Sequence, residues 1–232
     1  MTERAAKWFA RMDNCGVIVA TALLALAATQ EIALSPCART AIAGRVECGT
    51  VRVPENRARP SARSLSIFVL VLRATGDASG EPAGEPVFFF TGGPGSAASL
   101  SAAYLSAQLA PLRATRDFVF IDQRGTGRSA PLVCGFPQDP VKRLEPMFDP
   151  ALTASCRASL QRAADLRFYT TSDAALDVDD VRKALGYERI NLHGSSYGTR
   201  AAWAYAAKFP DRVRAVALHG AAPPGFLLPL PF

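Results

Sequence analysis

The chain has 232 residues, of which 49% are hydrophobic, so it is long enough to bury a substantial core as one domain. This composition excludes a disordered chain. The net charge is +6, but the basic residues are scattered among the acids and form no long basic block. That distribution argues against a nucleic-acid partner, because an arginine-rich solvated surface accounts for it equally well.

Residues 1–28 have the features of an export signal. Two basic residues, Lys7 and Arg11, precede the apolar run Cys15–Ala28. Within that run, Ala25–Ala27 has the small-x-small pattern after which signal peptidases cut. A retained membrane anchor is the alternative, and it is less favoured because the run is short for a helix that crosses a bilayer. We predict a signal peptide over residues 1–28 and a periplasmic or secreted protein with no stable membrane anchor.

Four cysteines remain after the predicted signal, and an even number in an exported chain suggests two disulfides. Three pairings are possible. The local one, Cys37 with Cys48 and Cys134 with Cys156, closes the shortest loops and is the pairing that we predict. The cysteines show no C-x-x-C spacing and no zinc-ligand pattern with the two histidines, which argues against a metal site.

Strand and helix patterns alternate along residues 29–232, which we predict to form one partial domain. The strand candidates are apolar and rich in β-branched or aromatic residues, and they cover residues 48–54, 64–74, 87–90, 117–122, 189–193 and 213–219. The helix candidates cover residues 99–110, 172–185 and 197–209. Residues 131–170 read as an irregular to helical insertion. This order predicts an α/β fold with a mainly parallel sheet flanked by helices.

The helix predicted over residues 172–185 shows the clearest periodicity. Ala174, Val178, Val181 and Leu185 recur at spacings of four, three and four residues, which places them on one helix face. Ser172 is available as an N-cap, and Gly186 is typical of a helix stop, so both ends carry a recognisable signal.

The segment Ile190–Thr199, INLHGSSYGT, contains a candidate nucleophile turn. In such a strand-to-helix turn the residues two before and two after the serine must be small. Ser196 meets this requirement, with Gly194 and Gly198, whereas the neighbours of Ser195 would be a histidine and a tyrosine. The helix that follows also directs free amides and its positive dipole end at the serine. Ser196 is therefore the predicted nucleophile, rather than a serine in a loop without chemistry.

A second glycine-rich element follows the predicted strand 87–90. The sequence FFFTGGPGSA places Gly92, Gly93, Pro94 and Gly95 where a serine hydrolase of this layout completes its oxyanion hole. Glycines let the backbone approach a substrate carbonyl because no Cβ intervenes. The loop lacks the GK[ST] of a P-loop and the GxGxxG of a dinucleotide site, which argues against a phosphate site.

Several separate motifs, in order, resemble the prolyl aminopeptidase and tripeptidyl aminopeptidase group of α/β-hydrolases. They are GGPGSA, DQRGTGRSA, the stretch YTTSDAALDVDDVRKALGYERINLHGSSYGT, and FPDRVRAVALHGAAPP. The resemblance runs from about Cys48 to the last residue. It implies an α/β-hydrolase fold and an exported bacterial serine peptidase that releases N-terminal residues or short peptides.

The resemblance also implies roles for individual residues. Ser196 would be the nucleophile, and the backbone amides of Gly93 and Tyr197 would form the oxyanion hole. Asp122 and Arg124 would organise the loop beside the site, and a structural salt-bridged turn is the role we favour for them. In this family the cysteines that match Cys134 and Cys156 flank an insertion, which agrees with the predicted pairing. Residues that support the site loops are Gly92, Pro94, Gly95, Gly194 and Gly198.

The sequence offers no clear general base. In this fold the triad order is Ser, then Asp or Glu, then His, and the residues after Ser196 contain only Asp211 and His219 as candidates. Asp211 follows a helix at the end of the sheet away from the nucleophile. The family usually has Asp where His219 stands, and a packing role is typical there. His193 precedes the turn and reads as a core histidine.

The apolar, proline-rich end of the chain suggests an N-terminal fragment, with the fold cut after about the sixth strand and without most of the cap and the C-terminal core. Such a fragment would be inactive, because it lacks the triad Asp and His, and poorly soluble, because its last strand is an open edge. The alternatives are an esterase of the same fold or a non-catalytic exported binding domain. The predicted partner is a peptide with a free N-terminus. No cofactor is expected, and the oligomeric state is open.

Overall fold

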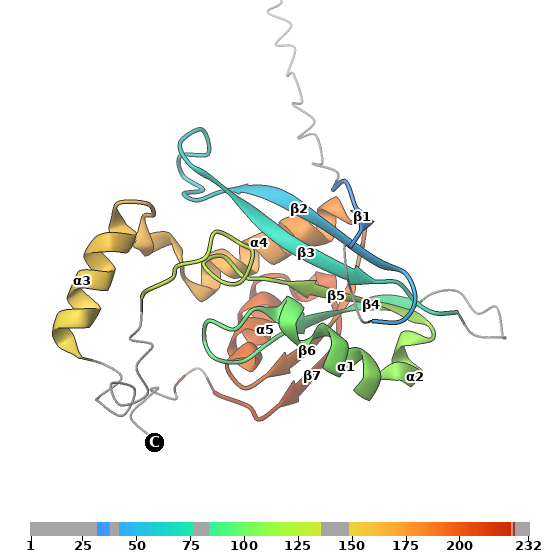
Figure 1. Ribbon diagram of the computed structural model, residues 1–232. Helices are drawn as coiled ribbons and strands as arrows, with labels where there is room; N and C mark the ends of the chain where they lie inside the picture. The colour runs from blue at the N-terminus through green and yellow to red at the C-terminus, as the bar shows by residue number, and fades with distance from the viewer. Residues whose placement is uncertain (1–31, 38–41, 77–83, 136–148, 224, 226–232) are drawn as a thin grey trace, which may run out of the picture.

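The centre of the molecule is a mixed sheet of seven strands, in the order β1-β2-β3-β5-β4-β6-β7 (Figure 1). The computed structural model describes residues 32–37, 42–76, 84–135, 149–223 and 225. The predicted signal peptide lies outside these residues. The strands are β1 (Ser35–Pro36), β2 (Val46–Pro54), β3 (Ser64–Leu72), β4 (Gly84–Phe90), β5 (Arg116–Ile121), β6 (Ile190–Ser195) and β7 (Val213–His219).

Half of the sheet is antiparallel and the other half is parallel. β1, β2, β3 and β5 pair antiparallel in that order, whereas β5, β4, β6 and β7 pair parallel. All six predicted strands are present. β1 was not predicted, because its two residues are too few to show an alternating pattern; it pairs with Glu47 and Cys48 of β2.

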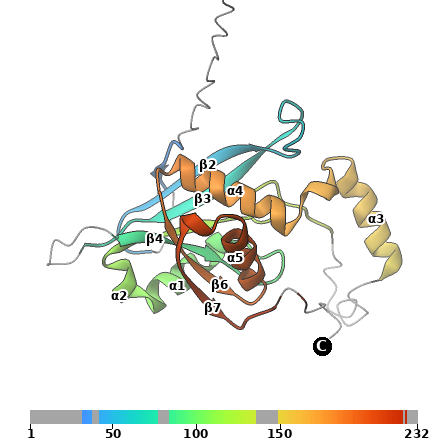
Figure 2. The same cartoon turned by 180° about the vertical axis from the view of Figure 1, so that it is seen from behind.

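Helices cover both faces of the sheet at β4 and β5, which explains why the apolar runs of these two strands are buried on both sides. Figure 2 shows α4 (Thr171–Ala184) and α5 (Tyr197–Lys208) together in front of one face. They pack on Phe88 and Phe90 of β4. The opposite face, with Phe89, is covered by η2 (Ala98–Ser101) and α1 (Ala102–Gln108). Each buried side chain of this size contributes about 1.5–3 kcal/mol to stability.

The helix α4 begins earlier than the sequence predicted. Its N-cap is Thr170, whose Oγ1 accepts a hydrogen bond from Asp173 N at 3.1 Å. The predicted cap Ser172 is wrong, because it lies inside the first turn. The predicted stop is in place: Gly186 has φ of +76° directly after the C-cap Leu185, a conformation that favours glycine.

The segment that we predicted as an insertion contains α3 (Pro150–Gln161), an α-helix without buried residues. This helix projects beside the sheet (Figure 1). A disulfide joins Cys156 of α3 to Cys134, with Cα atoms 5.5 Å apart. A second disulfide joins Cys37 to Cys48, with Cα atoms 5.1 Å apart. The structure thus contains both predicted local pairs. The remaining helical turns are α2 (Ala110–Arg113), η4 (Leu166–Phe168) and η5 (Pro210–Arg212).

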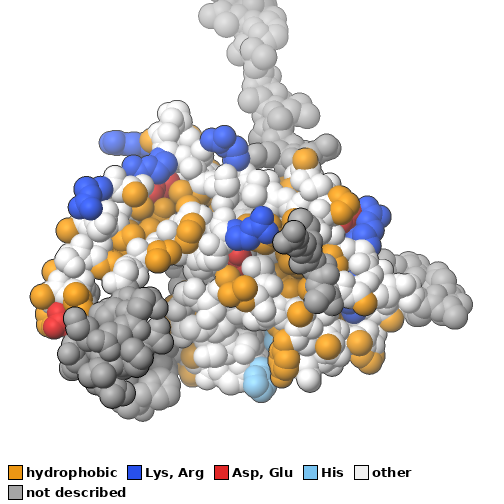
Figure 3. Space-filling model, viewed as in Figure 1, with side chains coloured by type: hydrophobic (Ala, Val, Ile, Leu, Met, Phe, Trp, Pro, Cys, Tyr) orange, Lys and Arg blue, Asp and Glu red, His pale blue; other side chains and the backbone are white. Residues whose placement is uncertain are grey.

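Strand β7 contrasts with the buried strands. Within the described residues it pairs with β6 alone, and every residue after Val213 is exposed. Val216 and Leu218 expose 44% and 39% of their surface. Hydrophobic side chains are also visible along the lower part of the face drawn in Figure 3. Among the described residues, this part of the fold therefore presents apolar surface and a strand edge without a partner strand.

Candidate active site

Ser196 lies at the sharp turn between β6 and α5. Its φ and ψ are 54° and −125°, so it is one of two residues other than glycine with positive φ in the described chain. Such a conformation is strained for a residue with a Cβ and is typical of functional turns. The Ser196 side chain makes no cap hydrogen bond to α5, so its hydroxyl is not used to hold the helix.

The two glycines beside Ser196 are sterically required. A Cβ on Gly194 would lie 2.8 Å from the carbonyl oxygen of Gly198. A Cβ on Gly198 would overlap the carbonyl group of Phe90 on β4. Real Cβ atoms essentially never approach backbone atoms this closely, so neither position accepts a larger residue unless the backbone moves.

The glycine-rich loop after β4 faces the Ser196 side chain. A Cβ on Gly92 would lie 3.0 Å from the Cβ and 3.4 Å from the Oγ of Ser196. Gly93 and Gly95 have φ of +110° and +106°, and Pro94 between them follows a cis peptide bond. The structure therefore brings together the two segments that the sequence proposed, although they are about a hundred residues apart.

The first turn of α5 is the second segment that lies beside Ser196. Tyr197 is its first residue, and the Tyr197 hydroxyl lies 2.7 Å from Thr171 Oγ1 at the start of α4. Thr199 anchors the turn, since its amide and its hydroxyl both donate to Ser196 O, at 2.9 and 2.6 Å. The positive end of this twelve-residue helix thus points at the serine.

Asp122 organises the loop that follows β5. It is fully buried and accepts hydrogen bonds from Ser99 N (2.9 Å), Ser99 Oγ (3.0 Å) and Arg128 N (3.0 Å). Because both carboxylate oxygens are occupied, Asp122 fixes the 122–130 loop against η2. Asp122 has no ion pair among the described residues, so the predicted salt bridge is wrong for Asp122, and hydrogen bonds hold the turn instead.

Arg124 joins three segments in the protein interior. Its guanidinium forms two hydrogen bonds of 2.6 Å with the carboxylate of Asp177 on α4, and it also donates to the carbonyl oxygens of Glu55 and Phe168. Arg57 reaches Asp177 from the β2–β3 loop at 2.6 Å. The sequence did not single out Asp177 or Arg57, because Asp177 is one of several acids in its stretch and the partners of both residues are remote in the chain.

His193 lies in β6, three residues before Ser196. It is half-buried, its ring centroid is 5.1 Å from that of Phe89, and its Nδ1 has no hydrogen-bond partner among the described residues. Burial lowers its pKa below the usual 6.5, and the charge of His219 lowers it further. This environment favours the neutral ring of a core histidine.

The two candidates after Ser196 occupy opposite ends of β7. Asp211 precedes Val213, which pairs with Ile190 at the start of β6, so it lies at the edge of the sheet away from Ser196. His219 is the last residue of β7 and pairs with Ser195. Its carbonyl oxygen accepts a hydrogen bond of 2.9 Å from Ser196 N. That bond occupies the Ser196 amide.

Comparison with known proteins decides the family. The model of the α/β hydrolase fold family matches residues 85–231, which include β4 after its first residue, β5, β6, β7 and the candidate site. The chain belongs to the α/β hydrolase fold family. The predicted fold class is therefore confirmed.

The curated relatives of this α/β-hydrolase include bacterial peptidases. A tripeptidyl aminopeptidase of Streptomyces coelicolor is 34% identical over 73% of this chain and 34% of its own length. Serine protease Hip1 of Mycobacterium tuberculosis is 32% identical over 84% of this chain and 40% of its own. A proline iminopeptidase of Neisseria meningitidis is 32% identical over 61% and 34%. The predicted resemblance is confirmed, and the chain spans about a third to two fifths of these relatives.

Proposed function

We propose that this α/β-hydrolase provides the nucleophile and the oxyanion hole of a serine peptidase that releases N-terminal residues or short peptides. The observation that carries the proposal is the strained backbone of Ser196, whose side chain faces the Gly92–Gly95 loop. The names of the relatives, tripeptidyl aminopeptidase and proline iminopeptidase among them, support peptide bonds as the substrate class.

In the proposed reaction, Ser196 Oγ attacks the carbonyl carbon of the scissile peptide bond and forms a tetrahedral intermediate. The amides of Gly93 and Tyr197 donate hydrogen bonds to its oxyanion. Collapse of the intermediate breaks the C–N bond, the leaving amine takes up the proton that the Ser196 hydroxyl gave up, and the acyl group left on Ser196 is then transferred to water. Gly92, Pro94 and Gly95 shape the donor loop, and the glycines beside Ser196 allow the close approach of α5 to β4.

Neither histidine of the chain is assigned as the general base. His193 Nδ1 is enclosed beside Phe89, and His219 reaches Ser196 through its backbone carbonyl. Without a histidine oriented by an acid, proton removal from Ser196 is slow. By themselves, the 232 residues of this chain would therefore react slowly or not at all.

We further propose that the protein acts outside the cytoplasm. Two disulfides in the described chain are typical of oxidising compartments, and this agrees with the export signal predicted over residues 1–28. No helix within the described ranges is long and apolar enough to cross a bilayer. The proposed substrate is a peptide with a free N-terminus, and the proposed chemistry uses no cofactor.

Labelling with a fluorophosphonate probe tests the nucleophile. We expect slow covalent labelling of the protein that Ser196→Ala abolishes and that the matched variant Ser195→Ala leaves within about twofold. Labelling that survives Ser196→Ala but is lost in Ser195→Ala would overturn the assignment. Peptidyl-anilides and short acyl esters separate a peptidase from an esterase. Ser196-dependent cleavage of the esters without cleavage of the anilides would favour the esterase.

Variants of the histidines test the base. His193→Gln and His219→Gln should each change the labelling rate by less than about threefold, because a working base contributes on the order of 100-fold or more. A loss of more than about tenfold in His219→Gln alone would identify His219 as the base.

A further inference from the structure

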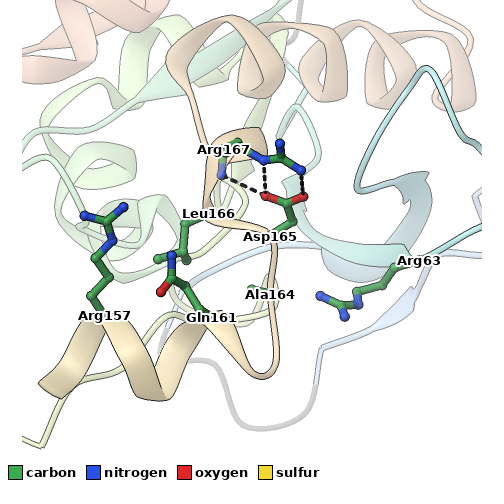
Figure 4. A pocket seen from close by; sticks show the side chains of 7 residues that line it. All are labelled: Arg63, Arg157, Gln161, Ala164, Asp165, Leu166 and Arg167. Atoms are coloured by element: carbon green, nitrogen blue, oxygen red, sulfur yellow. Dashed lines mark hydrogen bonds and ion pairs between the residues drawn. The ribbon is translucent and has the colours of Figure 1, made fainter. Parts of the chain in front are cut away.

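A cavity lined by arginines lies next to α3, apart from the Ser196 turn. Its volume is about 530 Å³. Arg63 reaches it from the β2–β3 loop, Arg157 from α3, and Arg167 from η4, so three separate segments contribute a guanidinium (Figure 4). None of these arginines has a role in the proposed hydrolysis.

The acids around the cavity already have partners. Asp165 accepts two hydrogen bonds from the Arg167 side chain, at 2.9 and 2.6 Å, which neutralises that pair. Glu55 forms an ion pair of 3.2 Å with Arg63 and also accepts hydrogen bonds from Asp165 N and Tyr169 Oη. The acidic groups within reach are therefore engaged in other contacts.

Of the three arginines that line this cavity, only Arg157 has no ion pair or hydrogen-bond partner among the described residues. Gln161 lies one turn further along α3 and also lines the cavity without such a partner in the described chain. In Figure 4 both side chains stand on one side of the cavity, with Arg63 across from them and the Asp165–Arg167 pair between. One uncompensated guanidinium and one amide thus face a space that Leu166 also lines.

The neighbouring space extends the cavity along the β2–β3 loop. A second cavity of about 470 Å³ shares Arg63, Asp165 and Arg167 with the first, and Arg59 also lines it. The shared arginines and Asp165 make the two cavities neighbours, so basic side chains continue along the loop from the first cavity to the second. The loop joins Pro54 to Ser64 at the edge of the sheet where β5 ends, which is also the edge of Ser196.

We propose that this arginine pocket binds a carboxylate of an acidic peptide, with Arg157 and Arg63 as the charged donors. The planar fork of arginine matches a carboxylate in shape. A singly charged carboxylate balances Arg157, which is the one guanidinium of the first cavity without an ion pair or hydrogen bond among the described residues. The peptide nature of the ligand rests on the proposed function, but binding of the carboxylate does not require catalysis.

Equilibrium binding tests the pocket separately from hydrolysis. The full chain carrying Ser196→Ala, which cannot form an acyl-enzyme, is titrated into a fluorescein-labelled peptide of alternating Ala and Glu, and anisotropy is measured. We expect Arg157→Gln to weaken binding about tenfold, as for loss of a charged hydrogen bond, and Arg63→Gln to weaken it less. The matched control is Arg162→Gln, because Arg162 follows α3 but bonds to Ala158 O and Ser159 Oγ and does not line the cavity.

The outcomes either support or overturn the pocket. Binding that is lost for the Ala-Gln peptide, weakened by Arg157→Gln and unchanged within about twofold by Arg162→Gln supports it. Equal weakening by Arg157→Gln and Arg162→Gln would show general attraction to a basic surface and overturn it. Displacement of the peptide by inorganic phosphate but not by succinate at equal charge concentration would also overturn the carboxylate assignment.

Discussion

The two strands that flank β6 hold Ser196 in different ways. β4 pairs on both sides, and Pro86–Phe90 are all buried. β7 pairs with β6 alone within the described chain and is exposed at every residue after Val213. Ser196 is therefore held by steric contact on the β4 side and by one backbone hydrogen bond, Ser196 N to His219 O, on the β7 side. We expect substitutions on the β4 side to cost more than substitutions on the β7 side.

Gly198→Ala tests the β4 side and should have the largest effect. The added methyl group would overlap the carbonyl of Phe90, so we expect a loss of about 3 kcal/mol or more in the free energy of unfolding. The sign is informative, because Gly→Ala inside a helix otherwise stabilises by about 0.5–1 kcal/mol. Urea denaturation measures it. Gly135→Ala is the control, since nothing lies within 4 Å of its added Cβ; equal stability of both variants would contradict the steric argument.

Gly220→Ala tests the β7 side and should cost less. The nearest atom to the added Cβ is Ser196 N at 4.0 Å, so space is available, but φ is +62°. We expect a loss of about 1–2 kcal/mol, the penalty for an L-residue in the left-handed region. Gly220→Asn should cost less than Gly220→Ala, because Asn tolerates this conformation. Equal losses for Ala and Asn in the same urea experiment would show that backbone conformation is not the cause.

Ser196→Gly measures the backbone strain at Ser196, the residue that the β4 side and the β7 side both hold. Glycine adopts positive φ without the Cβ penalty, so we expect about 1 kcal/mol of stabilisation together with loss of probe labelling. Ser195→Gly is the matched control: Ser195 is in β6, where glycine costs about 0.5–1 kcal/mol. Destabilisation of similar size in both variants would show that the Ser196 backbone stores no strain.

The local parts of the site could be predicted from the sequence, and the contacts between distant segments could not. The choice of Ser196 over Ser195 depended on the small neighbours Gly194 and Gly198, a requirement that acts within five residues. The contact of Gly198 with Phe90 depends on how closely α5 packs on β4. The hydrogen bond from Ser196 N to His219 O depends on the register of β6 and β7, and no spacing in the sequence encodes that register.

The same distinction applies to charged residues and to the fold. The alternation of apolar runs and helix periods predicts six strands and their order along the chain, but β1 is too short to leave a pattern. The motif DQRG drew attention to Arg124. Its partner Asp177 is one of several acids on α4, and only the packing of that helix selects it.

The stability of the fold should depend on pH through His193, which lies in β6 between the buried β4 and the exposed β7. Burial, and secondarily the charge of His219, lower its pKa in the folded state below the value of about 6.5 in the unfolded chain. The unfolded chain therefore binds more protons, so the contribution is complete above about pH 6.5 and is lost as pH falls below it. His193→Gln should reduce the loss of unfolding free energy between about pH 7.5 and 5.5. The change should be smaller than the glycine effects, because solvent screens a half-buried ring.

Urea denaturation at about pH 7.5 and 5.5 gives the change in unfolding free energy between the two pH values for each protein. His219→Gln is the control. It removes the repulsion between the charge of His219 and the His193 ring, which is the smaller cause of the lowered His193 pKa, and it leaves the burial of His193 in place. It should therefore change the pH dependence less than His193→Gln does. An unchanged pH dependence in His193→Gln would show that the ring is not the group responsible.

Val216→Thr should have the smallest effect on stability and a visible effect on association. Thr keeps the β-branched shape that suits a strand, and Val216 is 44% exposed, so the free energy of unfolding should change by less than about 0.5 kcal/mol. Because Val216 is exposed on β7, whose outer edge has no partner strand among the described residues, the substitution should lower self-association in sedimentation velocity. Leu100→Thr is the control: Leu100 is 84% exposed but lies in η2, away from any strand edge. If Leu100→Thr reduced association and Val216→Thr did not, exposed apolar area would matter more than the β7 edge.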